Sequence, residues 1–400
     1  MLRHLVWLAI GAFAIGTETF VIAALLPSIA SDLHVTVAVA GQVVTIFALG
    51  YAVGSPVLSV LAGGIDRKWL LVACLLVFTL ANVAAAAAQT LPQLSFARIL
   101  LALSAGLYMP TANAVATTLV APEKRGRAIA VVVGGMTVAV TFGVPLGALI
   151  GAYANWRTTF LMVAVIGAVA ALGLVIGLPR GLPRTISTLT QRLAVGRRPE
   201  ILHGLAVTLV FATGVFAVFT FLAPLLAQAA GFASQGVSAT LFVFGAAAAI
   251  GNAAGGHAAD RFGPVATVRA GLFVLAIAFA MLGFAATSLP TAPAAIVMVV
   301  AVALWGVTGW GLYSAQMANF VRLAPDVSMV ALSLNASTFY LGVAVGSALG
   351  AFTLSVTTVR DLGWVAAAAQ VLALIILQLA PRAAAPLAMA SAVQPSRGIE

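Results

Sequence analysis

The chain has 400 residues, of which 63% are hydrophobic and only 7% are charged, and its mean hydropathy is +1.16. This composition leaves too little polar surface to cover a water-soluble globule, so it excludes a soluble protein. The net charge of +10 would suggest nucleic acid as the partner of a soluble protein, but the basic residues here fall in short connections between apolar runs. We therefore expect a lipid bilayer as the partner, and no nucleic acid.

Apolar runs of bilayer length, separated by turn and charge signals, follow one another along the whole sequence. The first run continues to Leu26, about twice the length of a signal-peptide core, so we interpret it as a retained span. The fold class that this pattern predicts is all-α, a polytopic membrane protein. The pattern predicts twelve spans, at 5–27, 37–62, 69–88, 92–118, 127–152, 158–179, 201–229, 236–259, 266–288, 292–320, 328–356 and 362–380.

The 19 Lys and Arg residues indicate the orientation of these spans. If the N-terminus is cytoplasmic, sixteen of them lie on the cytoplasmic side, Arg157 and Arg360 lie outside, and Arg98 lies inside a span. Short cytoplasmic loops of membrane proteins carry such an excess of positive charge. We therefore expect both termini in the cytoplasm.

Landmarks in the first half of the chain recur in the second half at a nearly constant displacement. The displacement is 199 residues for three glycines, 197 for a proline and 194 for an Asp-Arg pair. The matched residues are Gly143, Gly147 and Gly151 with Gly342, Gly346 and Gly350, Pro27 with Pro224, and Asp66-Arg67 with Asp260-Arg261. This repeat predicts two parallel six-helix bundles, because six is an even number of spans. The expected parts are an N-terminal bundle (1–179), a basic cytoplasmic linker (180–200), a C-terminal bundle (201–380) and a cytoplasmic tail (381–400).

The loop from Gly256 to Gly263, which contains Asp260 and Arg261, resembles the Gly-x-x-x-Asp-Arg-x-Gly signature of the major facilitator superfamily. The first copy keeps Asp66 and Arg67 but has other residues where the signature has its two glycines. Such motifs are candidates for cytoplasmic ion pairs that latch one access state. A solvated charged loop is the alternative reading, because exposed ion pairs contribute only about 0–1 kcal/mol each.

Two further stretches resemble the twelve-span drug/proton antiporter branch of that superfamily, particularly sugar-efflux (arabinose-efflux type) and chloramphenicol-resistance proteins. The stretch TETFVIAALLPSIASDL, which begins at Thr17, carries the likeness to these proteins. The stretch Gly143-Val144-Pro145-Leu146-Gly147 is similar to the glycine-proline motif associated with antiporters, with one residue inserted between glycine and proline. The resemblance implies multidrug or sugar efflux across a bacterial cytoplasmic (inner) membrane. The glycines four apart could equally serve plain helix packing, whereas Pro145 favours a role in bending.

Glu18 and Arg98 are the two charged residues that lie well inside the predicted spans. An ionised side chain at the bilayer centre costs about 2.5–3.5 kcal/mol, so neither is expected to face lipid. Helix rise places Glu18 about 13 Å and Arg98 about 9 Å below the outer surface, so the two can pair if their helices are neighbours. A nearby guanidinium favours the ionised carboxylate and burial favours the neutral one, so the pair can couple proton binding to conformation. A permanent pair that only orients helices is the alternative.

Polar and aromatic residues inside the other spans are candidates for the lining of a substrate cavity, although each could also belong to the core or to an interfacial belt. As a set they indicate a mainly apolar, aromatic site that suits an amphipathic or hydrophobic small molecule. Tyr51, Phe219, Trp310 and Gln316 belong to the wider group. The main candidates are Gln42, Tyr108, Asn113, Phe216, Trp305, Tyr313, Asn335 and Tyr340.

Other classes of function lack the residues that they need in this sequence. A phosphate-binding loop needs Lys before Ser or Thr, but Lys68 and Lys124 precede Trp and Arg. We expect neither an enzyme nor a metal site nor a cofactor, and we expect a monomer. The sequence favours a secondary active transporter that exports a small organic solute in exchange for protons by alternating access. A proton-coupled uptake symporter and a passive channel or sensor remain as alternatives.

Overall fold

The computed structural model of the chain describes residues 2–121, 124–179, 181–182 and 194–379. Within these ranges all regular secondary structure is helical, and twelve helical segments are long and apolar enough to cross a membrane. The predicted fold class is therefore confirmed. The expected tail (381–400) and most of the expected linker (180–200) lie outside the described residues.

The first six spans form the N-terminal half. Gly41 separates the two helices of the second span, and the fifth span contains a π-helical turn at Ala139–Gly143. The second span runs over Val37–Gly64, in agreement with the span expected at 37–62. The helices are α1 (Leu2–Asp32), α2 (Val37–Ala40), α3 (Gln42–Leu61), α4 (Arg67–Ala87), α5 (Leu91–Thr118), α6 (Arg125–Val138), α7 (Val144–Tyr153) and α8 (Trp156–Gly177).

The last six spans form the C-terminal half. The seventh span is broken at Thr220 and Phe221, whereas the sequence suggested one helix. The first helix of this half begins two residues before the predicted boundary at 201. The helices are α10 (Pro199–Phe219), α11 (Leu222–Ala230), α12 (Ser234–Phe262), α13 (Pro264–Ser288), α14 (Thr291–Leu323), α15 (Ser328–Val356) and α16 (Leu362–Gln378).

The two prolines matched by the repeat act differently in the two halves. Pro27 lies inside α1, which continues to Asp32 instead of ending at the proline as predicted. A proline removes one backbone hydrogen bond, and membrane helices tolerate this where neighbouring groups compensate. Pro224 lies in the first turn of α11, where its missing N–H has no helical partner to lose, and the break in the span precedes it.

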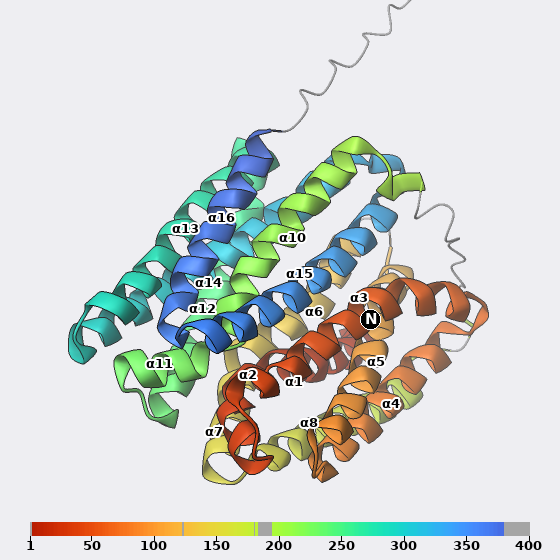
Figure 1. The fold of residues 1–400 in the computed structure, drawn as a ribbon. Coiled ribbons are helices and arrows are strands. Elements are labelled where there is room, and N and C mark those ends of the chain that lie inside the picture. Colours follow the sequence, from red (N-terminus) through yellow and green to blue (C-terminus); the bar gives the residue numbers. More distant parts are fainter. Residues whose placement is uncertain (1, 122–123, 180, 183–193, 380–400) are drawn as a thin grey trace, which may run out of the picture.

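The two halves lie side by side, and α3 packs against α15 while α7 packs against α12 (Figure 1). We call the end of the bundle with the α3–α4, α5–α6, α12–α13 and α14–α15 connections the basic end, because most of the Lys and Arg lie there. The other end is the opposite end. These names carry no statement about the side of the membrane on which each end lies.

Hydrogen bonds join the halves in the middle of the bundle and toward the opposite end. Ser347 Oγ donates to the Gly41 carbonyl at 3.1 Å, and Gln235 Nε2 donates to the Tyr153 hydroxyl at 2.9 Å. Nearer the middle, Thr141 in the π-helical turn donates to the Gly245 carbonyl at 3.0 Å. The protein is therefore closed at the opposite end.

At the basic end, several polar contacts of the described residues hold the N-terminal half together. Asp66 caps the start of α4 by accepting from Lys68 N at 2.9 Å, and its second oxygen accepts from Gly181 N at 3.2 Å. Lys68 Nζ donates to the Leu178 carbonyl at 2.6 Å, at the end of α8. In this state the Asp66 carboxylate thus holds the end of its own half, and the latch between halves stays a prediction for another state.

Candidate functional site

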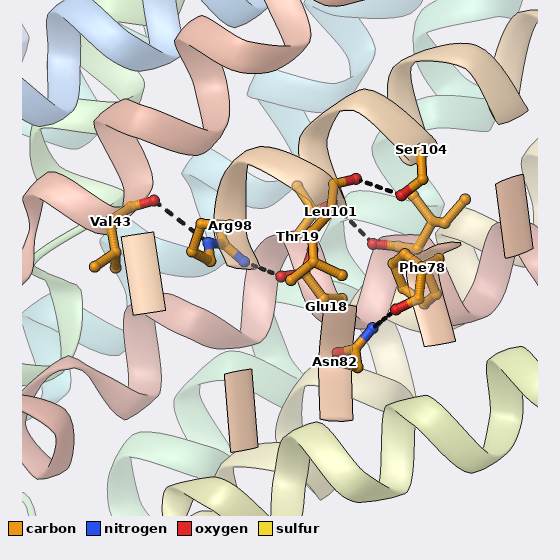
Figure 2. A network of polar contacts seen from close by, with 9 residues as sticks. Glu18, Thr19, Val43, Phe78, Asn82, Arg98, Leu101 and Ser104 are labelled. Atoms are coloured by element: carbon orange, nitrogen blue, oxygen red, sulfur yellow. Dashed lines mark hydrogen bonds and ion pairs between the residues drawn. The ribbon is translucent and has the colours of Figure 1, made fainter. Parts of the chain in front are cut away.

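Glu18 of α1 and Arg98 of α5 form an ion pair inside the N-terminal half, and both side chains are fully buried (Figure 2). The start of α5 sets the depth of the arginine, because Thr90 caps that helix and Pro92 occupies its first turn. Arg98 follows about two turns later. The structure thus brings together the two charged residues that helix rise placed at similar depth.

Arg98 joins three helices and not only two. Its Nε donates to the Val43 carbonyl at 3.3 Å, and its guanidinium carbon lies 4.3 Å from the centre of the Phe47 ring. Both of these residues belong to α3, so Figure 2 shows the arginine between Val43 on one side and Glu18 on the other. A planar guanidinium suits this combination of ion pairing and stacking, which a lysine could not reproduce.

The pair is not fully satisfied by its neighbours. Among the residues that the structure describes, Glu18 Oε2 and Arg98 Nη2 have no hydrogen-bond partner, and neither does the adjacent Thr17 Oγ1. An unpaired polar group in a buried site is expensive, and it is tolerated mainly where a function or a bound water uses it. These three atoms can therefore still form a hydrogen bond with a water or a ligand.

Aromatic side chains from both halves meet beside the pair. Phe20 of α1 contacts Phe216 and Phe219 of α10, with ring centres 6.4 and 5.7 Å apart. Tyr51 of α3 stacks on Tyr340 of α15, with ring centres 3.6 Å apart. These contacts build an apolar seal between the halves, and they enclose a small cavity that Arg98 lines from the N-terminal side.

The candidate lining residues fall into two groups. Phe216 and Tyr340 line the cavity, and Tyr313 adjoins it through Phe339, whose ring centre is 4.9 Å away. Asn113 does not line this cavity; it is half-buried on α5, and its Oδ1 has no partner among the described residues.

The other candidates lie within one half or at the surface. Tyr108 donates to the Leu8 carbonyl at 3.0 Å, inside the N-terminal bundle. Trp305 packs among aromatic rings of the C-terminal bundle, and Asn335 accepts from Thr208 at 2.8 Å there. Gln42 is exposed near the opposite end. None of these four lines the cavity in this state. They were predicted as lining residues because the hydrophobic pattern does not show which face of each helix meets the other half.

Sequence reasoning missed several residues that do line the cavity. Thr19 and Phe20 directly follow Glu18, so their position beside the acid was a usable signal. Phe47, Thr220 and Phe339 also line it, but a lone threonine or phenylalanine in an apolar span carries no distinguishing pattern.

The glycine stripe of the fifth span packs on α1 beside the ion pair. A Cβ at Gly143 would overlap Thr17 Oγ1, and one at Gly147 would lie 2.7 Å from the Val21 side chain. The matched glycines on α15 meet the backbone of α10 in the same way, since a Cβ at Gly342 would lie 2.7 Å from the Leu209 carbonyl oxygen. The repeat in the sequence therefore corresponds to equivalent close helix packing in both halves.

The comparisons with known proteins agree with this architecture. The family model described as Major Facilitator Superfamily matches residues 8–347. The chain belongs to the Major Facilitator Superfamily. It is therefore a transporter rather than an enzyme, and a multi-pass membrane protein.

Two relatives and one solved structure illustrate how similar this chain is to other proteins of the superfamily. The chain is 32% identical over 355 residues to the chloramphenicol resistance protein of Streptomyces lividans, which covers 88% of this chain and 89% of that one. It is 31% identical to the inner membrane transport protein YdhP of Escherichia coli (strain K12), covering 87% and 88%. The crystal structure of a D-xylose-proton symporter has the same fold, with a TM-score of 0.80, 15% identity, and 95% and 97% of the chains covered.

Proposed function

We propose that this Major Facilitator Superfamily protein exports a small organic solute across the bacterial cytoplasmic membrane in exchange for protons. The observation that carries the proposal is the fully buried Glu18–Arg98 pair beside the cavity between the halves. The excess of positive charge at the basic end supports a cytoplasmic location for that end. The structure then represents a state closed toward the outside.

The pair gives a physical route from proton binding to conformational change. Protonation of Glu18 leaves the charge of Arg98 without its counterion in an apolar site, and such a charge is strongly unfavourable. Opening the cavity toward water at the opposite end relieves this cost, since water can then solvate the guanidinium. A proton from outside is thus bound in the outward-open state. The outer seal then closes with the proton on Glu18, and release of the proton to the inside restores the Glu18–Arg98 pair.

The direction and the class of the solute follow from one relative and from the aromatic lining of the cavity. A relative of similar length is named a chloramphenicol resistance protein, which favours export of an uncharged aromatic compound. The rings of Phe20, Phe216, Phe219 and Tyr340 suit such a compound, because aromatic faces stack on planar groups. Each proton that moves inward contributes about 2.3 kcal/mol per 100 mV of membrane potential to export.

Transport in proteoliposomes tests the proposal, with chloramphenicol as the probe. We expect a pH gradient to drive chloramphenicol movement by the wild-type protein and by Glu200→Gln, which removes an exposed acid on α10. Glu18→Gln should lose gradient-driven transport and keep exchange of labelled for unlabelled chloramphenicol. Gradient-driven export by Glu18→Gln at the wild-type rate would refute the proton-coupling role. Uptake together with protons would instead identify a symporter.

A further inference from the structure

The cavity beside the ion pair is shared by the two halves. Thr19 and Arg98 line it from the N-terminal half, and Thr220 and Tyr340 line it from the C-terminal half. The centre of a water-sized sphere can occupy about 10 Å³ in it, which is close to the lower limit for holding one water molecule. In this closed state it therefore fits a water and not an organic substrate.

Two of the residues that line this cavity carry a polar atom without a protein partner. Within the described part of the chain, Arg98 Nη2 and Thr220 Oγ1 have no hydrogen-bond partner, and both residues are fully buried. Thr19 Oγ1 uses its hydrogen on the Ile15 carbonyl at 2.8 Å, so its lone pairs can still accept a bond. A cavity lined only by apolar groups stays dry, but one with two to four polar partners binds water.

We propose that a single water molecule occupies this cavity and links Arg98 of one half to Thr220 of the other. The water accepts a hydrogen bond from Arg98 Nη2 and donates its own hydrogens to Thr220 Oγ1 and Thr19 Oγ1. This arrangement satisfies the free guanidinium N–H with a partner that the protein itself does not supply. Charge-assisted bonds of this kind are stronger than neutral ones, so the water is held firmly.

The position of Thr220 makes this link sensitive to closure of the opposite end. Thr220 lies in the break between α10 and α11, and α11 packs against α1. The next residue, Phe221, fits against two glycines, because a Cβ would lie 2.6 Å from its ring at Gly41 and 2.8 Å at Gly350. Thr220 therefore reaches the cavity when the opposite end is closed.

The consequence is a coupling role for Thr220, and this role rests on the proposed function. The water satisfies Arg98 in the closed state, whereas solvent satisfies it when the opposite end opens. Removing the threonine hydroxyl should weaken only the closed state. Thr220 thus acts as a positioning residue for the water, through which the C-terminal half senses the Glu18–Arg98 pair.

Two variants separate the hydroxyl from the shape of the side chain. Thr220→Val keeps the volume and loses the hydroxyl, and Thr220→Ser keeps the hydroxyl. Spin labels on cysteines at Gln89 and Ser288, both exposed at the opposite end, report its opening in full-length protein from which Cys74 has been removed. We expect Thr220→Val to increase the open population about fivefold or more, and Thr220→Ser to resemble the wild type. Equal populations in the valine and serine variants would overturn the coupling role.

A high-resolution density map of the closed state tests the water directly and does not depend on the variants folding. We expect one peak within hydrogen-bonding distance of Arg98 Nη2 and Thr220 Oγ1, and an empty cavity would overturn the proposal. Neither measurement uses a proton gradient or a substrate. Failure of proton-driven export would therefore refute the proposed function and leave both of these outcomes unchanged.

Discussion

Replacement of Glu18 by glutamine tests how strongly the buried pair holds the opposite end closed. The change removes the counterion of Arg98 and leaves an amide oxygen of nearly the same shape, so one hydrogen bond from the guanidinium can remain. The contacts of Arg98 with Val43 and Phe47 are untouched. The perturbation is thus the loss of charge compensation at a site where both side chains are fully buried.

The magnitude follows from the burial of the pair. Removing one partner of a buried ion pair costs about 3–5 kcal/mol, and each 1.4 kcal/mol corresponds to a tenfold change in an equilibrium constant. The remaining amide hydrogen bond places the expected effect at the lower limit. Since the open state solvates Arg98 with water, we expect Glu18→Gln to shift the closed-to-open equilibrium about 100-fold toward the open state.

Distance measurements between labels at Gln89 and Ser288 provide the assay. The double variant Glu18→Gln/Arg98→Gln is the matched control, because it removes both charges and leaves no uncompensated cation. We expect it to return toward the wild-type distribution of distances. The same distribution in Glu18→Gln and in the wild type would refute the reasoning, and so would a double variant that is as open as the single one.

Two further predictions concern packing and the lining of the site. Gly143→Ala should lower the thermal unfolding midpoint, since its Cβ would overlap Thr17 Oγ1 and overpacking costs about 1–3 kcal/mol. Gly134→Ala, with open space around its Cβ, should leave the midpoint unchanged or raise it, and equal losses in both variants would contradict the packing argument. Phe20→Ala should weaken chloramphenicol binding about tenfold in equilibrium binding measurements, because the ring contacts Phe216, Phe219 and Trp310. Phe96→Ala, at an exposed ring, should bind as the wild type does, and unchanged affinity in Phe20→Ala would remove Phe20 from the site.

The spans and the charged pair could be predicted from the sequence because both depend only on distances along the helix axis. Span length follows from bilayer thickness, and the similar depth of Glu18 and Arg98 follows from helix rise along two predicted spans. A charged residue in an apolar run has few tolerable environments, so its partner could be sought by depth alone. The structure places these two side chains in contact.

The faces of the helices were not accessible in the same way. Tyr108 and Trp305 were predicted as lining residues, but each packs inside one bundle. The sequence could not show this, because a central membrane helix is apolar on every side and has no distinct face. Thr220 was overlooked since its importance comes from the break in the seventh span. Pro224 served in the sequence only as a landmark of the repeat, and the break before α11 became visible only in the structure.

The division of the site between the halves separates two kinds of chemistry. Both ionised residues belong to α1 and α5, whereas Phe216, Phe219, Phe339 and Tyr340 come from the C-terminal half. Substitutions among these four rings can reshape the recognition surface and leave the carboxylate and the guanidinium in place. If the proposed proton coupling holds, the C-terminal half can change the solute that is bound over evolutionary time while the N-terminal half keeps the proton-binding residues.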